Sequence, residues 1–205
     1  MHGFSDRVHH AFAFTAKHYA ATAPSGAGAE YFAHPANVAV ILTRYGVDQA
    51  TLIAGILHHV LEAAPPDESP QLERKISAKF GPVVLAVARD AIEPRWLPHG
   101  APMPWQTAHD ELLVHLANAD PRALDIIVAD QLHATGTTTT ALRRLGVEYL
   151  RDRTRATSAQ TIWWYRSMLE VLDQRIDWPH RTMLDELRQL SADLLRDLRT
   201  SEDHR

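Results

Sequence analysis

Apolar positions recur along this chain at spacings of three and four, and proline or glycine interrupts the pattern at intervals. In residues 5–21, for example, Val8, Phe12 and Ala16 fall on one stripe of a helix. Strand-like alternation is nearly absent, so the pattern predicts an all-α fold. The helices that we expect cover residues 5–21, 35–45, 49–63, 69–79, 83–92, 106–118, 121–134, 141–153, 158–176 and 180–199.

Local signals define several of these boundaries. Pro35 suits the first turn of the helix that it opens, and Asp48 is a good N-cap for the next. Residues 22–29 are expected to form a loop, and residues 136–140 a flexible break. Residues 93–105 are rich in proline and tryptophan. Their composition leaves two interpretations open, a lid over a pocket or a connector that packs its tryptophans.

Composition limits the class of protein. The chain has 205 residues, of which 45% are hydrophobic and 22% charged, and its formal net charge is -4. These values predict one globular domain over residues 1–205 and give no basic excess for binding nucleic acid. Cysteine is absent, which excludes disulfides, thiolate metal sites and cysteine nucleophiles. No apolar run approaches the roughly 20 residues of a membrane span, and the start lacks a signal-peptide core. We therefore expect a cytoplasmic protein with no membrane partner.

Histidines in two neighbouring helices supply the candidate chemistry. His34 lies near the start of one expected helix, while His58, His59 and Glu62 lie together in the next. Residues at i, i+3 and i+4 share a helix face, so these side chains can point broadly into one cleft. Imidazoles and carboxylates that converge inside a helical domain are typical of a catalytic metal site.

The same segments resemble a known family. The stretches YFAHPANVAVIL (31–42) and AGILHHVLEA (54–63) are similar to the opening motifs of HD-domain hydrolases of the RelA/SpoT type, which include guanosine tetraphosphate pyrophosphohydrolases and small stand-alone relatives. FGPVV (80–84) and IVADQL (127–132) resemble later motifs of that family. The likeness covers roughly residues 8–175 and is densest at 31–63. It implies a single-domain, all-α HD-domain bundle of about eight to ten helices.

The resemblance also implies a metal site. In that family one ion, typically manganese, is held at the positions of His34, His58, His59 and Asp130. His59 replaces an expected aspartate, and three histidines with one aspartate favour manganese, zinc or iron(II) over magnesium. We therefore expect one divalent transition metal. The alternative is that His59 turns away and makes ordinary hydrogen bonds.

Two further residues carry catalytic expectations from the resemblance. Glu62 matches the first of two paired acids, and Ala63 replaces the second. A single carboxylate can still act as a general base on water, although an exposed charge at a helix end is the alternative. His133 matches a histidine in one form of the family's aspartate motif. It could donate a proton to a leaving oxygen, or it could be a partly buried polar residue.

The substrate contacts of the family are mostly lost. Ile127 and Ala134 replace a lysine and an asparagine, and phosphate-rich ligands need cations. Lys17, His18 and Arg44 remain as substrate-binding candidates, although spacing singles out none of the cations. The pattern therefore does not favour guanosine tetraphosphate, and it looks like a scaffold used for another small, phosphorylated substrate.

Three hypotheses about function follow. The first is a metal-dependent phosphohydrolase acting on a nucleotide or related phosphate ester. The second is a metal-independent enzyme that uses the histidines and carboxylates for acid–base chemistry on a small molecule. The third is a non-catalytic HD domain that binds a nucleotide or protein partner. Activity that survives chelation would favour the second, and binding without turnover the third. The amphipathic C-terminal helices fit either a homodimer or ordinary core packing.

Overall fold

The computed structural model describes residues 4–22, 28–154 and 156–203. In this part of the chain all regular structure is helical, apart from an isolated β-bridge between Trp96 and Pro102. The all-α prediction is confirmed. The helices are α1 (Asp6–Thr22), α2 (Gly28–Arg44), α3 (Gln49–Glu62), α4 (Ser69–Phe80), α5 (Pro82–Asp90), α6 (Trp105–Leu116), α7 (Pro121–Thr154), α8 (Ser158–Gln174) and α9 (Arg181–Asp203). Most of the predicted loop at 22–29 lies outside the described residues.

Contacts divide the chain into two compact units. The first contains the described residues up to Pro102 together with Ala119–Ile127, and the second contains Met103–Asn118 and the described residues from Val128 onward. The expectation of one domain over 1–205 stays a prediction. None of the described helices combines the length and apolar character that crossing a membrane requires.

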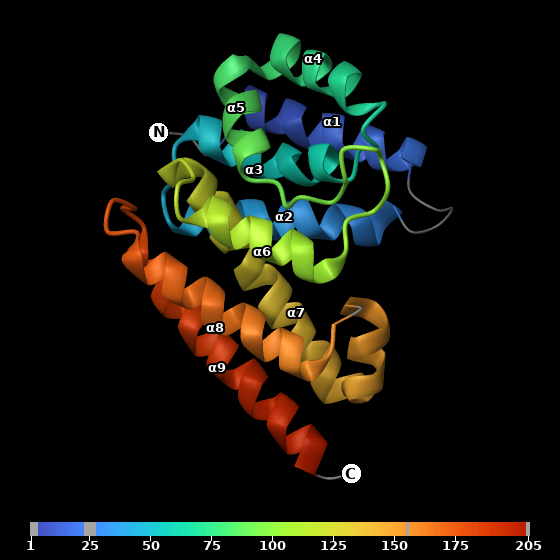
Figure 1. Cartoon of the computed structure of the whole chain (residues 1–205). Coiled ribbons are helices and arrows are strands. Elements are labelled where there is room, and N and C mark those ends of the chain that lie inside the picture. The colour runs from blue at the N-terminus through green and yellow to red at the C-terminus, as the bar shows by residue number, and fades with distance from the viewer. Residues whose placement is uncertain (1–3, 23–27, 155, 204–205) are drawn as a thin grey trace. The chain divides into compact units, whose positions relative to one another are not determined.

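The first unit is built around α3, which packs against α1, α2 and α5. Figure 1 shows α3 lying between α1 and α2. Its sequence explains this position, because ten of its fourteen residues are buried and they include Ile53, Ile56 and Leu57. The N-cap predicted at Asp48 is confirmed, since its carboxylate accepts a hydrogen bond of 2.8 Å from the Thr51 amide. Because α3 is apolar all round, its histidines are carried into the interior.

Helix α2 corrects one sequence prediction. Pro35 was expected in the first turn, but α2 begins at Gly28 and Pro35 lies inside it. A proline in a helix removes the hydrogen bond that its own nitrogen would donate to the carbonyl four residues earlier, here that of Tyr31. Despite this loss, α2 begins almost two turns before Pro35, so His34 lies within the helix.

Residues 91–104 connect α5 to α6 without helix. The Leu97 amide donates to the Ala101 carbonyl at 2.8 Å, and the Gly100 amide donates to the Leu97 carbonyl at 2.8 Å. Gly100 has φ +82°, a conformation that favours glycine. The middle of the segment is thus a hydrogen-bonded turn, and Trp105 at its far end begins α6.

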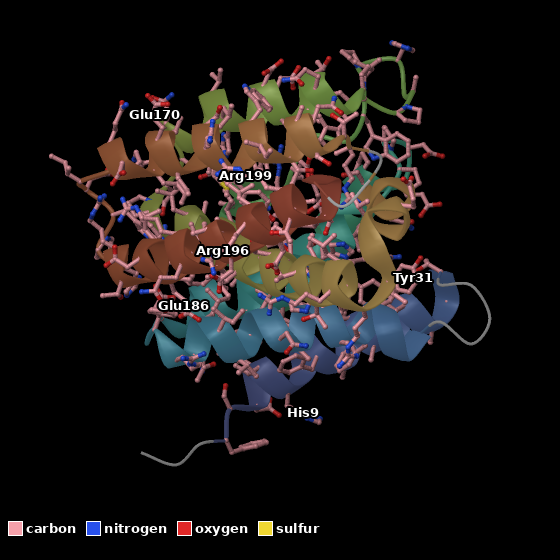
Figure 2. The ribbon with its side chains drawn as sticks, turned by 90° about the horizontal axis from the view of Figure 1, so that it is seen from below. His9, Tyr31, Glu170, Glu186, Arg196 and Arg199 are labelled. Carbon is pink, nitrogen blue, oxygen red and sulfur yellow. The ribbon has the colours of Figure 1, made fainter. Side chains whose placement is uncertain are left out.

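The second unit pairs α8 with α6 and α9. Helices α8 and α9 form a hairpin whose apolar seam buries Met168, Leu172, Leu184 and Leu187. Charged residues cover its outside, and Figure 2 labels three exposed ones, Glu170 on α8 and Arg196 and Arg199 on α9. Arg175 closes the turn of this hairpin, because its buried guanidinium donates to the Leu116 carbonyl at 2.6 Å and pairs with Asp177.

The predicted flexible break at 136–140 is wrong. These residues lie inside α7, and the chain departs from helical dihedrals at Gly146 (φ 82°, ψ 172°). The threonine hydroxyls bond within the helix, since Thr137, Thr139 and Thr140 each donate to the carbonyl four residues earlier at 2.8–3.0 Å. Such bonds satisfy the hydroxyls without interrupting the backbone ladder.

Candidate functional site

His58 lies at the centre of the candidate site in the first unit. Its side chain is almost fully buried, and its Nδ1 lies 2.6 Å from the carbonyl oxygen of Gly55 on the same helix. A carbonyl oxygen can only accept, so Nδ1 carries the proton and Nε2 keeps its lone pair. Histidines that ligate metals commonly have this tautomer, with the other ring nitrogen donating to a backbone carbonyl.

Helix α2 brings His34 beside this histidine. The ring centroids of His34 and His58 lie 5.7 Å apart, and those of His34 and His59 lie 4.6 Å apart. Gly55 permits this approach of α2 to α3, because a Cβ at residue 55 would lie 2.4 Å from Cδ1 of Leu42. The sequence prediction that two helices bring these three imidazoles together is confirmed.

His59 has a partner that sequence reasoning missed. The hydroxyl of Tyr19, on α1, lies 3.0 Å from Nδ1 of His59. Burial, together with the charge of Glu62, raises the pKa of Tyr19 well above its usual value, against an opposing effect of Arg95. Tyr19 therefore stays neutral. His59 makes an ordinary hydrogen bond through Nδ1, and its role as a metal ligand stays a prediction. Tyr19 gave no sequence signal beyond its place next to His18.

Glu62 is buried at the end of α3, one turn beyond the histidine pair. It forms an ion pair with Arg95 of the 91–104 segment. The alternative of an exposed charge at the helix end is therefore wrong, because the apolar environment of α3 extends to its last turn. Arg95 is the second residue that sequence reasoning missed, since its partner lies 33 positions away.

Asp130 and His133 belong to α7 in the second unit. Asp130 is half-buried, and its Oδ2 accepts a long hydrogen bond of 3.4 Å from Nε2 of the Gln131 side chain. It also contributes, after burial, to raising the pKa of the buried Tyr165 to about 12. His34, His58 and Asp130 have side chains suited to holding a metal ion. The ligand role of Asp130 and the acid role of His133 stay predictions.

The three substrate-binding candidates lie on two helices of the first unit. Lys17 and His18 precede Tyr19 on α1, and burial lowers the pKa of His18. Arg44 is exposed in the last turn of α2, ten residues or about 15 Å along the helix from His34. The structure thus places His18 beside a residue of the site and Arg44 at the far end of α2. Their roles in substrate binding stay predictions.

A family model described as "HD domain" matches residues 11–164. A curated relative, a GTP pyrophosphokinase of Streptomyces coelicolor, is 35% identical over 106 residues, which are 52% of this chain and 12% of the relative. The chain therefore corresponds to a small part of that protein.

Two solved structures share the fold. One is lmo0812 from Listeria monocytogenes EGD-e, with a TM-score of 0.66, 22% identity, and coverage of 80% of this chain and 99% of the other. The second is reported as a metazoan ortholog of SpoT that hydrolyses ppGpp, with a TM-score of 0.67, 20% identity, and coverage of 92% and 98%. At these identities the likeness shows the fold alone.

Proposed function

The chain belongs to the HD-domain family, and from this premise we propose that it is a metal-dependent phosphohydrolase acting on a small phosphorylated molecule of the cytoplasm, a nucleotide or related phosphate ester. One observation carries the proposal. His34 and His58 lie side by side from two packed helices, and His58 has its Nδ1 proton committed to Gly55. That arrangement presents Nε2 of a buried imidazole as a ligand.

The donor set fits a divalent manganese, zinc or iron ion. Two imidazoles from the first unit supply nitrogen ligands, and a carboxylate supplies an oxygen ligand that these ions also accept. We propose Asp130 as that carboxylate. Helix α7 supports this choice, because its first part belongs to the first unit and Ile126 there lies against Gly55. Asp130 follows Ile126 by four residues in uninterrupted helix, so both share one face.

The ion, Glu62 and His133 have separate proposed roles in hydrolysis. When bound, the ion supplies Lewis-acid activation of water and of the phosphoryl group. Glu62 is proposed to orient the attacking water and accept its proton. The buried position of Glu62 beside the histidine pair supports this role, and Arg95 balances its charge in the absence of substrate. His133 is proposed to protonate the leaving oxygen.

Elemental analysis tests the proposal. The protein, purified without added metal or a histidine tag, should carry manganese, zinc or iron near one ion per chain, or take up manganese on reconstitution. His58→Gln should lose the ion, whereas His99→Gln, at an exposed position in the 91–104 segment, should keep it. Chelation should abolish hydrolysis of phosphate esters. Absence of metal after reconstitution with manganese would refute the proposal.

A second candidate is an enzyme without metal that uses the same groups for acid–base chemistry. The Tyr19–His59 hydrogen bond favours this second candidate. His59 stands where the family's carboxylate ligand is expected, and its Nδ1 is engaged by Tyr19. Here His59→Ala is informative. Loss of the ion in that variant supports the first candidate, and turnover that persists in chelator with His59 intact supports the second.

A further inference from the structure

A cavity in the first unit lies directly beside Glu62. Its volume is about 460 Å³, within the range of small-molecule sites. The end of α3, the 63–68 turn and the start of α4 form one wall, and residues 92–98 form the other. Because Glu62 lines this cavity and lies one turn after the histidine pair, a molecule bound here lies beside the carboxylate proposed to activate water.

The lining of this cavity is mostly apolar and carries little positive charge. Among the described residues that line it, Arg95 is the one cation, and Glu62 and Glu93 are both acidic. Most other lining residues are prolines or large apolar side chains, including Trp96 and Leu97. A ligand with several phosphates needs several cations to offset its charge. This cavity instead matches a ligand with one phosphate and an uncharged, apolar organic group.

Arg95 is placed to receive that phosphate. Its side chain is 44% exposed, whereas that of its partner Glu62 is 8% exposed. The guanidinium therefore reaches from a buried carboxylate toward solvent. Its five N–H donors form a fork that can hold a phosphate while it still faces Glu62. A phosphate bound to Arg95 thus lies next to the carboxylate proposed to activate water.

The wall that carries Arg95 and Trp96 is held in shape by the backbone. Trp96 forms a β-bridge with Pro102, and the hydrogen-bonded turn at Leu97–Ala101 lies between them. The three prolines among residues 94–102 further restrict the chain. A ligand therefore meets a preformed wall, which favours selection by shape.

We infer that this cavity binds the substrate as a phosphate monoester of an apolar alcohol, with Arg95 as the receptor of its phosphate and Trp96 against its organic group. The inference rests on the proposed hydrolase function and specifies its substrate class. Hydrolysis adds water across the P–O bond. Oxygen from water bonds to phosphorus, the ester oxygen leaves with a proton, and the products are the alcohol and inorganic phosphate.

The test compares substrates and variants. With manganese present, kcat/KM is measured for 1-naphthyl phosphate, methyl phosphate and guanosine tetraphosphate, and binding of 1-naphthyl phosphate is titrated with and without manganese. The naphthyl ester should be the best substrate. Arg95→Gln should raise KM roughly 10- to 100-fold, the value of a lost charged hydrogen bond. Trp96→Ala should reduce the preference for naphthyl over methyl phosphate roughly 10-fold. Arg89→Gln removes an exposed arginine that is paired with Glu73 outside the cavity. This control variant should change neither KM nor the preference for naphthyl over methyl phosphate.

Glu62→Gln separates a ligand-binding role of Arg95 from a structural one. Removing the carboxylate takes away a negative charge beside the guanidinium, so this variant should bind 1-naphthyl phosphate more tightly while it loses turnover. A purely structural ion pair predicts weaker binding and lower melting temperatures in both Glu62→Gln and Arg95→Gln, which would overturn the inference. Equal effects of Arg95→Gln and Arg89→Gln would overturn it too.

The outcomes also separate this inference from the proposed function. If guanosine tetraphosphate is hydrolysed faster than the naphthyl ester, the substrate class is wrong and the hydrolase function stands. If no ester is hydrolysed but 1-naphthyl phosphate still binds in an Arg95-dependent way, the ligand class stands and the hydrolase function fails. Failure of 1-naphthyl phosphate to bind, with or without manganese, overturns the inference.

Discussion

Tyr19 offers a test at the scale of single residues, because its buried hydroxyl lies 3.0 Å from Nδ1 of His59. Tyr19→Phe removes this bond and little volume, and a typical hydrogen bond contributes about 1 kcal/mol to stability. In a chain of this size we expect the midpoint of thermal unfolding to fall by about 2–4 °C.

Tyr31 provides the matched control for that substitution. Its ring lies 5.9 Å from that of Tyr19, but its side chain is exposed, so Tyr31→Phe should change stability by less than about 0.5 kcal/mol. Calorimetry of both variants compares them directly. Equal shifts in the two variants would show that the Tyr19–His59 bond contributes nothing.

The residues of the site divide into those that a sequence pattern predicts and those that it does not. His58 and Glu62 are predicted, because they lie four positions apart in one helix and helical periodicity fixes which positions share a face. His34 is predicted from its place in the motif that resembles the family. Tyr19 and Arg95 are not predicted, because their partners His59 and Glu62 lie 40 and 33 positions away in the sequence, and no local rule connects positions that far apart. Their roles depend on how α1 and the 91–104 segment pack against α3. That packing is a tertiary property.

At the scale of elements, helix α7 contains two glycines, and replacing each with alanine should change the stability of the protein in opposite directions. Gly146 has φ 82° and ψ 172°, a region that is essentially restricted to glycine. Gly146→Ala should therefore destabilise the protein by about 1–3 kcal/mol through backbone strain alone, because no atom lies within 4 Å of the added Cβ. Denaturant titration measures the change.

Gly136→Ala is the control within the same helix. Gly136 also has open space around its Cβ position, but its backbone is helical. Alanine should stabilise the protein there by about 0.4–1 kcal/mol, because it reduces the entropy of the unfolded chain. If both substitutions change stability in the same direction, the strain assigned to Gly146 is absent.

The helices themselves were largely predictable from sequence, and the errors have specific causes. Asp48 caps α3 as expected, and Gly46, with φ 71°, follows the end of α2, since caps and breaks are local signals. The error at 136–140 arose because a glycine followed by threonines is typical of a loop between two helices. Here the hydroxyls bond back to the helix, and Gly136 is only one weak helix former within a long helix.

Helix α6 makes stability depend on pH through His109. The ring of His109 stacks on Trp105 with centroids 3.9 Å apart and meets the edge of Trp164 at 4.5 Å. Burial lowers the pKa of His109 below its usual value, against smaller opposing effects of the Trp105 carbonyl and Asp110. His109 therefore takes up a proton at higher pH in the unfolded chain than in the folded chain. Its contribution to the free energy of unfolding is present above about pH 6.5 and is lost progressively as the pH falls below that value.

His109→Phe tests that dependence. Phenylalanine keeps the aromatic contacts but cannot titrate, so the decrease in unfolding free energy between pH 8 and pH 5 should be smaller in the variant. The variant also loses the hydrogen bond from Nδ1 to the Trp105 carbonyl, which lowers stability equally at every pH above 6.5. The slope is therefore the informative quantity. Parallel curves for variant and parent would refute the role of His109.

At the scale of the whole molecule, the HD-domain match ends within α8 and leaves α9 beyond it. Each unit nevertheless has its own apolar core, around α3 in the first and along the α8–α9 seam in the second. Both imidazoles of the proposed metal site, His34 and His58, lie in the first unit. An ion that binds only the folded chain should raise the stability of that chain.

Manganese at about 100 times its dissociation constant should stabilise the folded chain by about 2.7 kcal/mol, provided that it binds only the folded state. The expected rise in unfolding midpoint is roughly 5–10 °C. Both His58→Gln and Asp130→Asn should lose this rise, because each removes a ligand. Asp173→Asn, at an exposed aspartate paired with Arg188, should retain it. A full rise in Asp130→Asn would exclude that residue as a ligand, and a full rise in His58→Gln would place any bound manganese outside the histidine pair.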